Sequence, residues 1–320
     1  MIEYIAAGNF ILDTVRFPDG SGNDRSSVGG PATFAYTGIK IWTDNVMQCS
    51  KVGADYGQFM DEWVKKNNVE TKGFKVTCDK CFTVTMTYGT KDGAPDRPDD
   101  ASPNRLFVRG TVAEDFGFMK TSPEDIEYFT RGGGVKGIYL SQNCDRVFWD
   151  KIRAIKKRDG FKLMWELEGS IAFPEFLENI RYCAEVPDVF SLNIQEAERL
   201  FGVEGEEACI KELQKLPFEL TLFRVGSRGL YSVTPDAAYY LPPAPCTVVD
   251  PTGCGNSSTG SALYAYAEGK NPLMVGIMAN VASAKNICQY SVIPDMVGIR
   301  RECYDLADEL YEKYSKEYNI

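Results

Sequence analysis

The chain has 320 residues, a formal net charge of −10 and 44% hydrophobic residues, so it is long enough to form a large core without metal ions or disulfides. Its acidic balance, with no long run of basic residues, argues against nucleic acid or an anionic membrane surface as a main partner. The complete absence of histidine excludes catalytic triads, general bases and metal sites built on imidazole.

Ten cysteines are scattered along the chain, and Met1-Ile2-Glu3-Tyr4 does not open a signal peptide. No apolar run approaches the roughly 20 residues that a membrane-spanning helix needs. We therefore expect a cytoplasmic protein with reduced thiols. Cys78 and Cys81 form a single CxxC pair, and a zinc site usually requires four ligands. Because no second pair stands at a suitable distance, we expect neither a metal nor a redox site there.

The first third of the sequence predicts short strands, a Gly-rich turn and helices. Gly29-Gly30-Pro31 separates a strand region from a helix. A loop rich in Gly, Pro and Asp at 89–104 joins two strand-like runs, which predicts a hairpin standing off the main body. The predicted strands are residues 2–7, 46–52, 82–88 and 106–108, and the predicted helices are residues 32–41 and 58–67.

From about residue 121 the pattern changes to alternating helices and strands. Ser122 and Pro123 form a typical helix start, with Ser as N-cap and Pro at the first position. Such alternation predicts a parallel sheet with helices on both faces, which binds ligands at the carboxyl ends of its strands. The predicted strands are 137–141, 161–167, 189–193, 220–225 and 230–233; the predicted helices are 146–158, 174–184, 195–201, 206–216 and a charged, outer helix at 299–318.

The most informative segment is residues 248–260, VVDPTGCGNSSTG. A strand-like pair leads into a Gly-x-Gly turn and then into a helical run. Glycines at such a turn allow backbone N–H groups to converge, and a helix N-terminus adds partial positive charge. This arrangement suits an anion or a transferring phosphoryl group. The two glycines alone are more typical of an ordinary turn and helix cap.

Residues 250–256, DPTGCGN, resemble the C-terminal signature D-[TP]-T-G-[AC]-G-D of the ribokinase (PfkB) family in six of seven positions. The resemblance implies an anion hole lined by Gly253, Cys254 and Gly255. It also implies a loop for a monovalent cation such as K⁺ that contains Asp250 and Thr252.

Further motifs of that family follow in the same order over residues 1–298, and the chain is identified as a member on that basis. They are residues 8–13 (GNFILD), 29–33 (GGPAT), 51–57 (KVGADYG), 193–196 (NIQE), 225–229 (VGSRG) and 279–284 (ANVASA). The resemblance implies a ribokinase-like α/β fold in one domain, residues 1–320, with a small β lid formed by about residues 13–30 and 80–112. In relatives the lid often pairs subunits, which implies a homodimer.

The resemblance implies that the first two motifs bind the sugar through Asn9, Asp13, Gly29 and Gly30. Phe34 stands where the family often has Asn, which predicts the loss of a polar sugar contact and an acceptor other than a standard furanose. Further substrate contacts are predicted at Asn143, Arg105 and Arg109, with Glu166 on the same side of the sheet. The two arginines are equally compatible with exposed charge on a lid; facing inward, they would suit a carboxylate or phosphate on the substrate.

On the nucleotide side, the resemblance implies that Glu196 holds Mg²⁺ through water and that Asn193 lies near the phosphates. The same pair is compatible with a plain helix cap. Arg224 is predicted to neutralise nucleotide phosphates, or else to be a solvated strand end. The remaining nucleotide contacts implied are Gly226, Gly229 and Asn280.

Asn256 occupies the position of the family's general base. An amide cannot accept the proton of an attacking hydroxyl, although its oxygen can orient that hydroxyl. Two main functions therefore remain open, beside a less favoured one as a structural or partner-binding protein that uses the edge of the hairpin. The first is an ATP- and Mg²⁺-dependent phosphotransferase that acts on an alcohol group of a sugar, polyol or related small molecule. The second is a pseudokinase that senses sugar or nucleotide with little catalysis.

Overall fold

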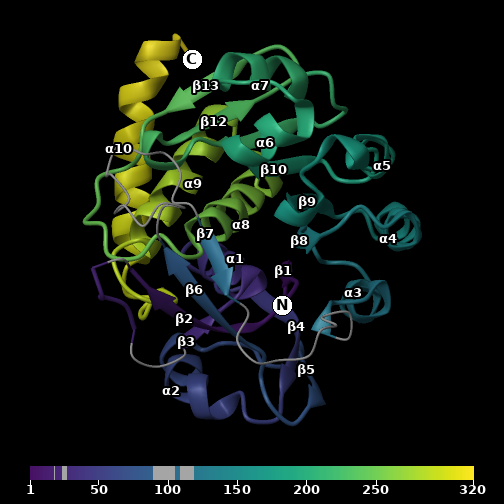
Figure 1. Ribbon diagram of the computed structural model, residues 1–320, viewed down its shortest axis with the longest axis vertical. Coiled ribbons are helices and arrows are strands. Elements are labelled where there is room, and N and C mark those ends of the chain that lie inside the picture. Colours follow the sequence, from purple (N-terminus) through teal and green to yellow (C-terminus); the bar gives the residue numbers. More distant parts are fainter. Residues whose placement is uncertain (18, 24–26, 89–104, 109–118) are drawn as a thin grey trace.

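The computed structural model describes residues 1–17, 19–23, 27–88, 105–108 and 119–320. Within these residues, one central sheet has the strand order β13-β12-β11-β10-β9-β8-β1-β4-β5 (Figure 1). The strands from β11 to β5 pair in parallel, and β12 and β13 add an antiparallel edge. The strands are β1 Tyr4–Ala7, β4 Val46–Gly53, β5 Phe74–Cys78, β8 Gly137–Gln142, β9 Lys162–Leu167, β10 Val189–Asn193, β11 Leu220–Arg224, β12 Leu230–Val233 and β13 Ala238–Leu241.

Helices cover both faces of this sheet because its inner strands are apolar on both sides. Successive residues of a strand point to opposite faces, so Tyr4 and Ile5 of β1 belong to two different core clusters. One face packs on α1 Pro31–Lys40, α8 Cys254–Ala267, α9 Pro272–Asn286 and α10 Arg300–Tyr318. The other packs on α3 Pro123–Thr130, α4 Arg146–Asp159, α5 Leu177–Cys183, α6 Ile194–Phe201 and α7 Glu206–Leu213. The predicted α/β architecture is confirmed.

A second, smaller sheet lies beside the first, in the order β3-β2-β6-β7. Its strands are β2 Ile11–Arg16, β3 Ser27–Gly29, β6 Thr83–Tyr88 and β7 Arg105–Val108. The predicted hairpin is confirmed, because β6 and β7 pair antiparallel. The loop predicted between them lies outside the described residues.

Some boundaries differ from the sequence prediction for identifiable reasons. The helix predicted at 174–184 opens as a 3-10 turn at Pro174–Phe176, and α5 begins only at Leu177. Strand β5 was not predicted, because it is short and its side chains are mostly exposed, so it contains no continuous apolar run. The start of α3 is confirmed, since Ser122 and Asp125 form a capping box. The outer helix α10 buries Cys303, Ala307 and Tyr314 and leaves most other side chains exposed.

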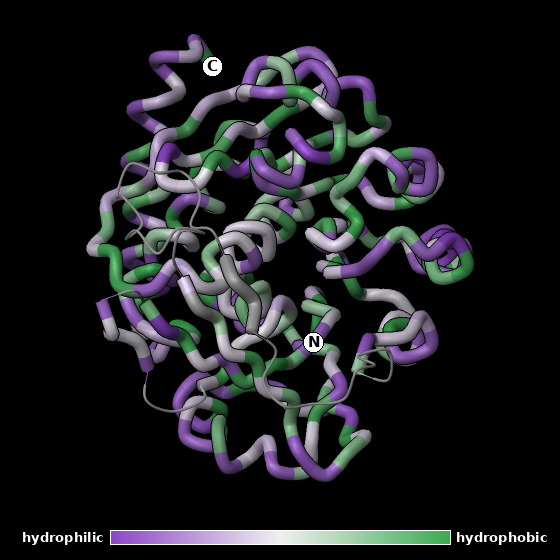
Figure 2. The backbone as a smooth tube through the Cα atoms, in the orientation of Figure 1, coloured by the Kyte–Doolittle hydropathy of each residue, from purple (hydrophilic) through white to green (hydrophobic). Residues whose placement is uncertain are grey.

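The polar character of the outer helices is visible in Figure 2, where α4 and α10 carry many hydrophilic residues. Among the described residues, no helix combines the length and the apolar composition required to cross a bilayer. All ten cysteines are free thiols. Burial raises the pKa of Cys81 in the CxxC pair to about 12, so this thiol stays protonated.

Candidate active site

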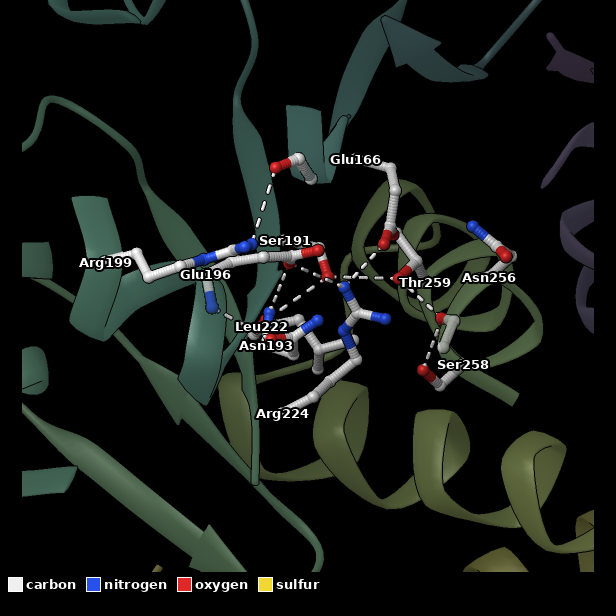
Figure 3. Close-up of polar contacts among 12 residues, drawn as sticks. Glu166, Ser191, Asn193, Glu196, Arg199, Leu222, Arg224, Asn256, Ser258 and Thr259 are labelled. Carbon is white, nitrogen blue, oxygen red and sulfur yellow. Dashed lines mark hydrogen bonds and ion pairs between the residues drawn. The ribbon is translucent and has the colours of Figure 1, made fainter. Parts of the chain in front are cut away.

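The candidate site lies where strands β8 to β11 reach the N-terminus of α8 (Figure 3). In parallel sheets, the carboxyl ends of neighbouring strands meet at one edge. Glu166, Asn193 and Arg224 stand at or near the ends of β9, β10 and β11. Asn256 lies in the first turn of α8. Residues far apart in the sequence therefore share one small region.

The N-terminus of α8 offers backbone donors. Gly253 is its N-cap with a φ of 77°. The N–H groups of Gly255 and Asn256 donate no hydrogen bond to the described part of the chain. Unpaired amides at the start of a helix, with the helix dipole behind them, form a ready anion site. Of the predicted anion-hole residues, Gly255 offers its N–H, whereas the N–H of Cys254 donates to the carbonyl of Pro251 at 3.2 Å.

Three glycines in this region are held close to functional side chains. A Cβ atom on Gly255 would lie 1.9 Å from a terminal nitrogen, NH1, of Arg224. One on Gly253 would lie 2.2 Å from the ring of Phe34, and one on Gly29 would lie 2.0 Å from Oδ2 of Asp13. Larger residues would displace these groups. The ring of Phe34 therefore packs between the predicted sugar-binding turn and the anion hole, and it is 2% exposed.

We expect Gly253→Ala to lower the free energy of unfolding by roughly 2–5 kcal/mol, from the positive φ and from the collision with Phe34. Gly160→Ala is the matched control, because Gly160 has a φ of 75° and open space around its Cβ position. The control should show the backbone strain alone, about 1–2 kcal/mol. Urea denaturation measures both values. Equal losses in the two variants would show that Phe34 is not packed as described.

Arg224 is not a solvated strand end. Its side chain is 15% exposed, and NH2 lies 2.5 Å from Oε1 of Glu166 and 3.9 Å from Oε2 of Glu196. The side chain of Glu166 is only 6% exposed. Nε of Arg224 and Oε2 of Glu166 are buried without a hydrogen-bond partner among the described residues. Arg224 therefore joins two carboxylates on one side to the α8 loop on the other.

Asn193 and Glu196 form a reciprocal helix cap. Oδ1 of Asn193 accepts the N–H of Glu196 at 3.0 Å, and Oε2 of Glu196 accepts the N–H of Asn193 at 2.8 Å. This helix cap holds the Glu196 carboxylate in place beside Arg224.

Asn256 is tied to the sheet beneath it. Its Nδ2 donates to the hydroxyl of Tyr139 in β8 at 3.0 Å. Burial, and then the nearby negative charge of Glu166, raise the pKa of Tyr139 well above its ordinary value, so its hydroxyl stays neutral. No local pattern distinguishes Tyr139, which is one of several bulky residues in a buried strand.

The predicted sugar-binding residues gather at the start of α1 and on β2. The Asp13 side chain is directed against Gly29, and the residue is 5% exposed. Gly30 is the N-cap of α1 with a φ of 90°. The carbonyl of Asn9 accepts the N–H of Ala32 at 3.3 Å. The structure brings these four residues together from two segments, residues 9–13 and 29–30.

The predicted monovalent-cation loop is rich in oxygen atoms. Oδ1 of Asp250 accepts the N–H of Thr252 at 2.9 Å, and the Thr252 carbonyl accepts Nδ2 of Asn286 at 2.8 Å. Oδ1 of Asn286 is buried and has no partner in the described residues. The Tyr88 hydroxyl lies 2.7 Å from Oγ1 of Thr252, which links strand β6 to the loop. Asn286 and Tyr88 were not predicted.

The predicted nucleotide turn has strong backbone constraints. Gly226 and Gly229 have φ values of 66° and 107°, and the N–H of Val225 donates to the carbonyl of Gly229 at 2.9 Å. Asn280 donates through Nδ2 to the carbonyls of Leu241 and Pro242, at 3.3 Å and 2.9 Å. Its visible role is to anchor the chain that follows β13.

Among the other predicted substrate contacts, Asn143 takes part in a local turn. Oδ1 of Asn143 accepts the N–H of Asp145 at 3.0 Å, in the turn before α4. Arg105 pairs with Tyr88 through the backbone of β7, and Arg109 lies outside the described residues. Glu166, in contrast, proves to be part of the site.

Comparison with known proteins identifies the family and the fold. Residues 7–297 match the description "pfkB family carbohydrate kinase". The cytidine kinase of Thermococcus kodakarensis is 23% identical over 300 residues, covering 90% of this chain and 96% of that protein.

Two solved structures share the fold at low identity. Aminoimidazole riboside kinase from Salmonella enterica, complexed with aminoimidazole riboside and an ATP analog, has a TM-score of 0.69 at 14% identity and covers 95% of this chain and 99% of its own. Adenosine kinase from Sinorhizobium meliloti has a TM-score of 0.69 at 18% identity and covers 94% of this chain and 99% of its own. Because the family match runs through nearly the whole described sheet and site, this protein belongs to the pfkB family of carbohydrate kinases.

Proposed function

We propose that this kinase transfers the γ-phosphoryl group of ATP, with Mg²⁺, to an alcohol group of a sugar, polyol or related small molecule. The observation that carries the proposal is the start of α8. There, two backbone N–H groups without partners in the described chain and the Arg224 guanidinium meet at Gly255. Phosphoryl transfer depends mainly on positioning and charge stabilisation of this kind.

Different residues of the chain have different roles in the proposed reaction. Asp13 is placed to accept hydrogen bonds from acceptor hydroxyls, since a carboxylate can accept several. The N–H groups of Gly255 and Asn256, with Arg224, stabilise charge on the transferring group. Because Asn256 is an amide, it orients the attacking hydroxyl but does not accept the proton of that hydroxyl, which goes to another acceptor.

The donor atoms fit the implied cations. Carboxylate oxygens of the kind offered by Glu196 and Glu166 suit Mg²⁺, which would supply positive charge to the phosphates when bound. Oxygen atoms of Asp250, Thr252 and Asn286 would hold a monovalent cation such as K⁺, and the buried Oδ1 of Asn286 has no other partner in the described chain. Gly226, Gly229, Asn193 and Asn280 would border the nucleotide.

The acceptor class includes nucleosides. The cytidine kinase and the riboside and adenosine kinases named above act on, or bind, sugars that carry a base. The apolar ring of Phe34, in place of a polar contact, favours an acceptor with fewer hydroxyl groups near the loop than a free furanose. Inward-facing Arg105 and Arg109 would add preference for a negative group.

We further propose a cytoplasmic protein that works as one domain, residues 1–320, with the small sheet as a lid. The unpaired thiols support the location. The lid would span about residues 13–30 and 80–112 and pair two subunits in a homodimer. Sedimentation at micromolar concentration measures that association, and a monomer would contradict it.

Phosphate transfer from labelled ATP to a panel of sugars, polyols, sugar acids and nucleosides tests the main proposal. We expect at least one acceptor to be phosphorylated in a Mg²⁺-dependent manner. The Asp13→Asn variant should bind ATP normally and lose most of this transfer. If ATP binds and no acceptor in the panel reacts, the proposal fails.

A second function, a pseudokinase sensor, is favoured by the hydrogen bond from Asn256 to Tyr139. This contact gives the amide a defined structural partner, as in a site that binds without rapid catalysis. The Asn256→Asp variant separates the two functions.

A further inference from the structure

The guanidinium group of Arg224 lies between two carboxylates and the N-terminus of α8. NH2 is 2.5 Å from Oε1 of Glu166 and 3.9 Å from Oε2 of Glu196. NH1 faces the other way, since a Cβ on Gly255 would come within 1.9 Å of it. Figure 3 shows Glu166, Glu196 and Thr259 of α8 grouped around the guanidinium of Arg224.

This is the place that a divalent cation takes in many phosphoryl-transfer sites, where it joins protein carboxylates to phosphate oxygens. Both carboxylates lie within 4 Å of the same nitrogen atom. A small cation in place of that nitrogen would lie beside Glu166 and would reach Glu196 through a water molecule. Oε2 of Glu166 adds an oxygen that is buried and has no partner among the described residues.

The burial of the pair makes this charge compensation necessary. The Glu166 side chain is 6% exposed and that of Glu196 is 14% exposed. Two carboxylates in such a position require a positive charge nearby. Among the described ion pairs, Arg224 supplies that charge to both.

We propose that Arg224 occupies the position of a divalent cation between Glu166 and Glu196, and so excludes such a cation from these carboxylates in the nucleotide-free protein. Its NH1 would then contact a phosphoryl oxygen at Gly255 while NH2 stays on the carboxylates. A cation that enters with the nucleotide must either displace Arg224 or bind beside it. The consequence for catalysis rests on the proposed function, but the exclusion itself does not.

The test uses Mn²⁺ as the probe and the full chain without nucleotide. Electron paramagnetic resonance measures free Mn²⁺ during titration of the wild type and of Arg224→Gln. We expect Arg224→Gln to bind one Mn²⁺ at least about tenfold more tightly than the wild type, because the competing charge is gone. Glu166→Gln in the Arg224→Gln background should abolish the gain. Arg224→Lys keeps a positive charge and should bind like the wild type.

Arg228→Gln is the matched control, since Arg228 stands in the turn that follows β11 and pairs with Glu206 at 2.7 Å, not with Glu166 or Glu196. It should produce no new Mn²⁺ site. The proposal is overturned if the wild type binds Mn²⁺ as tightly as Arg224→Gln at a site that Glu166→Gln removes. It is also overturned if folded Arg224→Gln gains no site.

Thermal unfolding provides a second measurement in case Arg224→Gln is much less stable than the wild type. Mn²⁺ should raise the melting temperature of Arg224→Gln more than that of the wild type, because it restores the missing charge. If Arg224→Gln is unfolded without metal, the proposal requires that Mn²⁺ restores its fold, and a failure to do so contradicts it. None of these measurements needs a phosphoryl acceptor, so a failed acceptor screen leaves their outcome unaffected.

Discussion

Asn256→Asp should raise the rate of phosphate transfer by about 10²–10⁴-fold, the usual contribution of a general base. The neutral hydroxyl of Tyr139, 3.0 Å from the present amide, can turn and donate to the new carboxylate. The rate of the variant should rise with pH as this carboxyl group ionises and then level off. Transfer by the wild type should lack that step. Steady-state kinetics over a range of pH measures both.

Asn271→Asp is the matched control. Asn271 also stands at a helix N-terminus, and its Nδ2 donates to the hydroxyl of Tyr311 at 2.7 Å. It lies outside the proposed site, so transfer should stay at the wild-type rate. A wild type without measurable transfer, combined with an active Asn256→Asp, would identify a pseudokinase. A loss of activity in Asn256→Asp would contradict the prediction and make the amide the working group of a divergent enzyme.

Arg224→Met should lower the free energy of unfolding by about 3–5 kcal/mol, because it leaves the buried Glu166 carboxylate without its counter-charge. The pair is well shielded from solvent, with side-chain exposures of 15% and 6%. Adding Glu166→Gln should restore most of the loss, since the remaining buried group is then neutral. Urea denaturation of the two single variants and the double variant measures the coupling between these residues.

Arg228→Met provides the comparison for an exposed pair. Arg228 and Glu206 are 45% and 24% exposed at a distance of 2.7 Å, and such pairs usually contribute no more than about 1 kcal/mol. If Arg224→Met costs no more than Arg228→Met, then Glu166 is not a buried charge that depends on Arg224. Arg224 would then not compensate the charge of Glu166 in place of a cation.

The agreement between the predicted and observed fold has a clear physical basis. Strands β1, β8, β9 and β10 are almost wholly buried, and they appear in the sequence as short apolar runs between helical segments. Chain reversals at Gly29-Gly30-Pro31 and at Ser122-Pro123 mark helix starts that depend on local chemistry. Strand β5 escaped prediction because an exposed edge strand lacks that apolar signal.

The candidate site was predictable only in part. The loop around Gly253 and the Asn193–Glu196 cap are local in sequence, so their motifs reveal them. Tyr139 and Asn286 act through contacts with residues 117 and 34 positions away, respectively. Neither carries a distinctive neighbouring pattern.

The sequence by itself determined the alternation of strands and helices, the anion loop at the start of α8 and the unusual amide at position 256. Each of these depends on neighbouring residues, where spacing and residue type decide the conformation. Only the tertiary structure decided what that amide contacts and where Arg224 lies. The strand order brings the ends of β9, β10 and β11 beside α8, and burial makes Glu166 depend on Arg224. Such pairings arise from long-range packing, so no local sequence pattern predicts them.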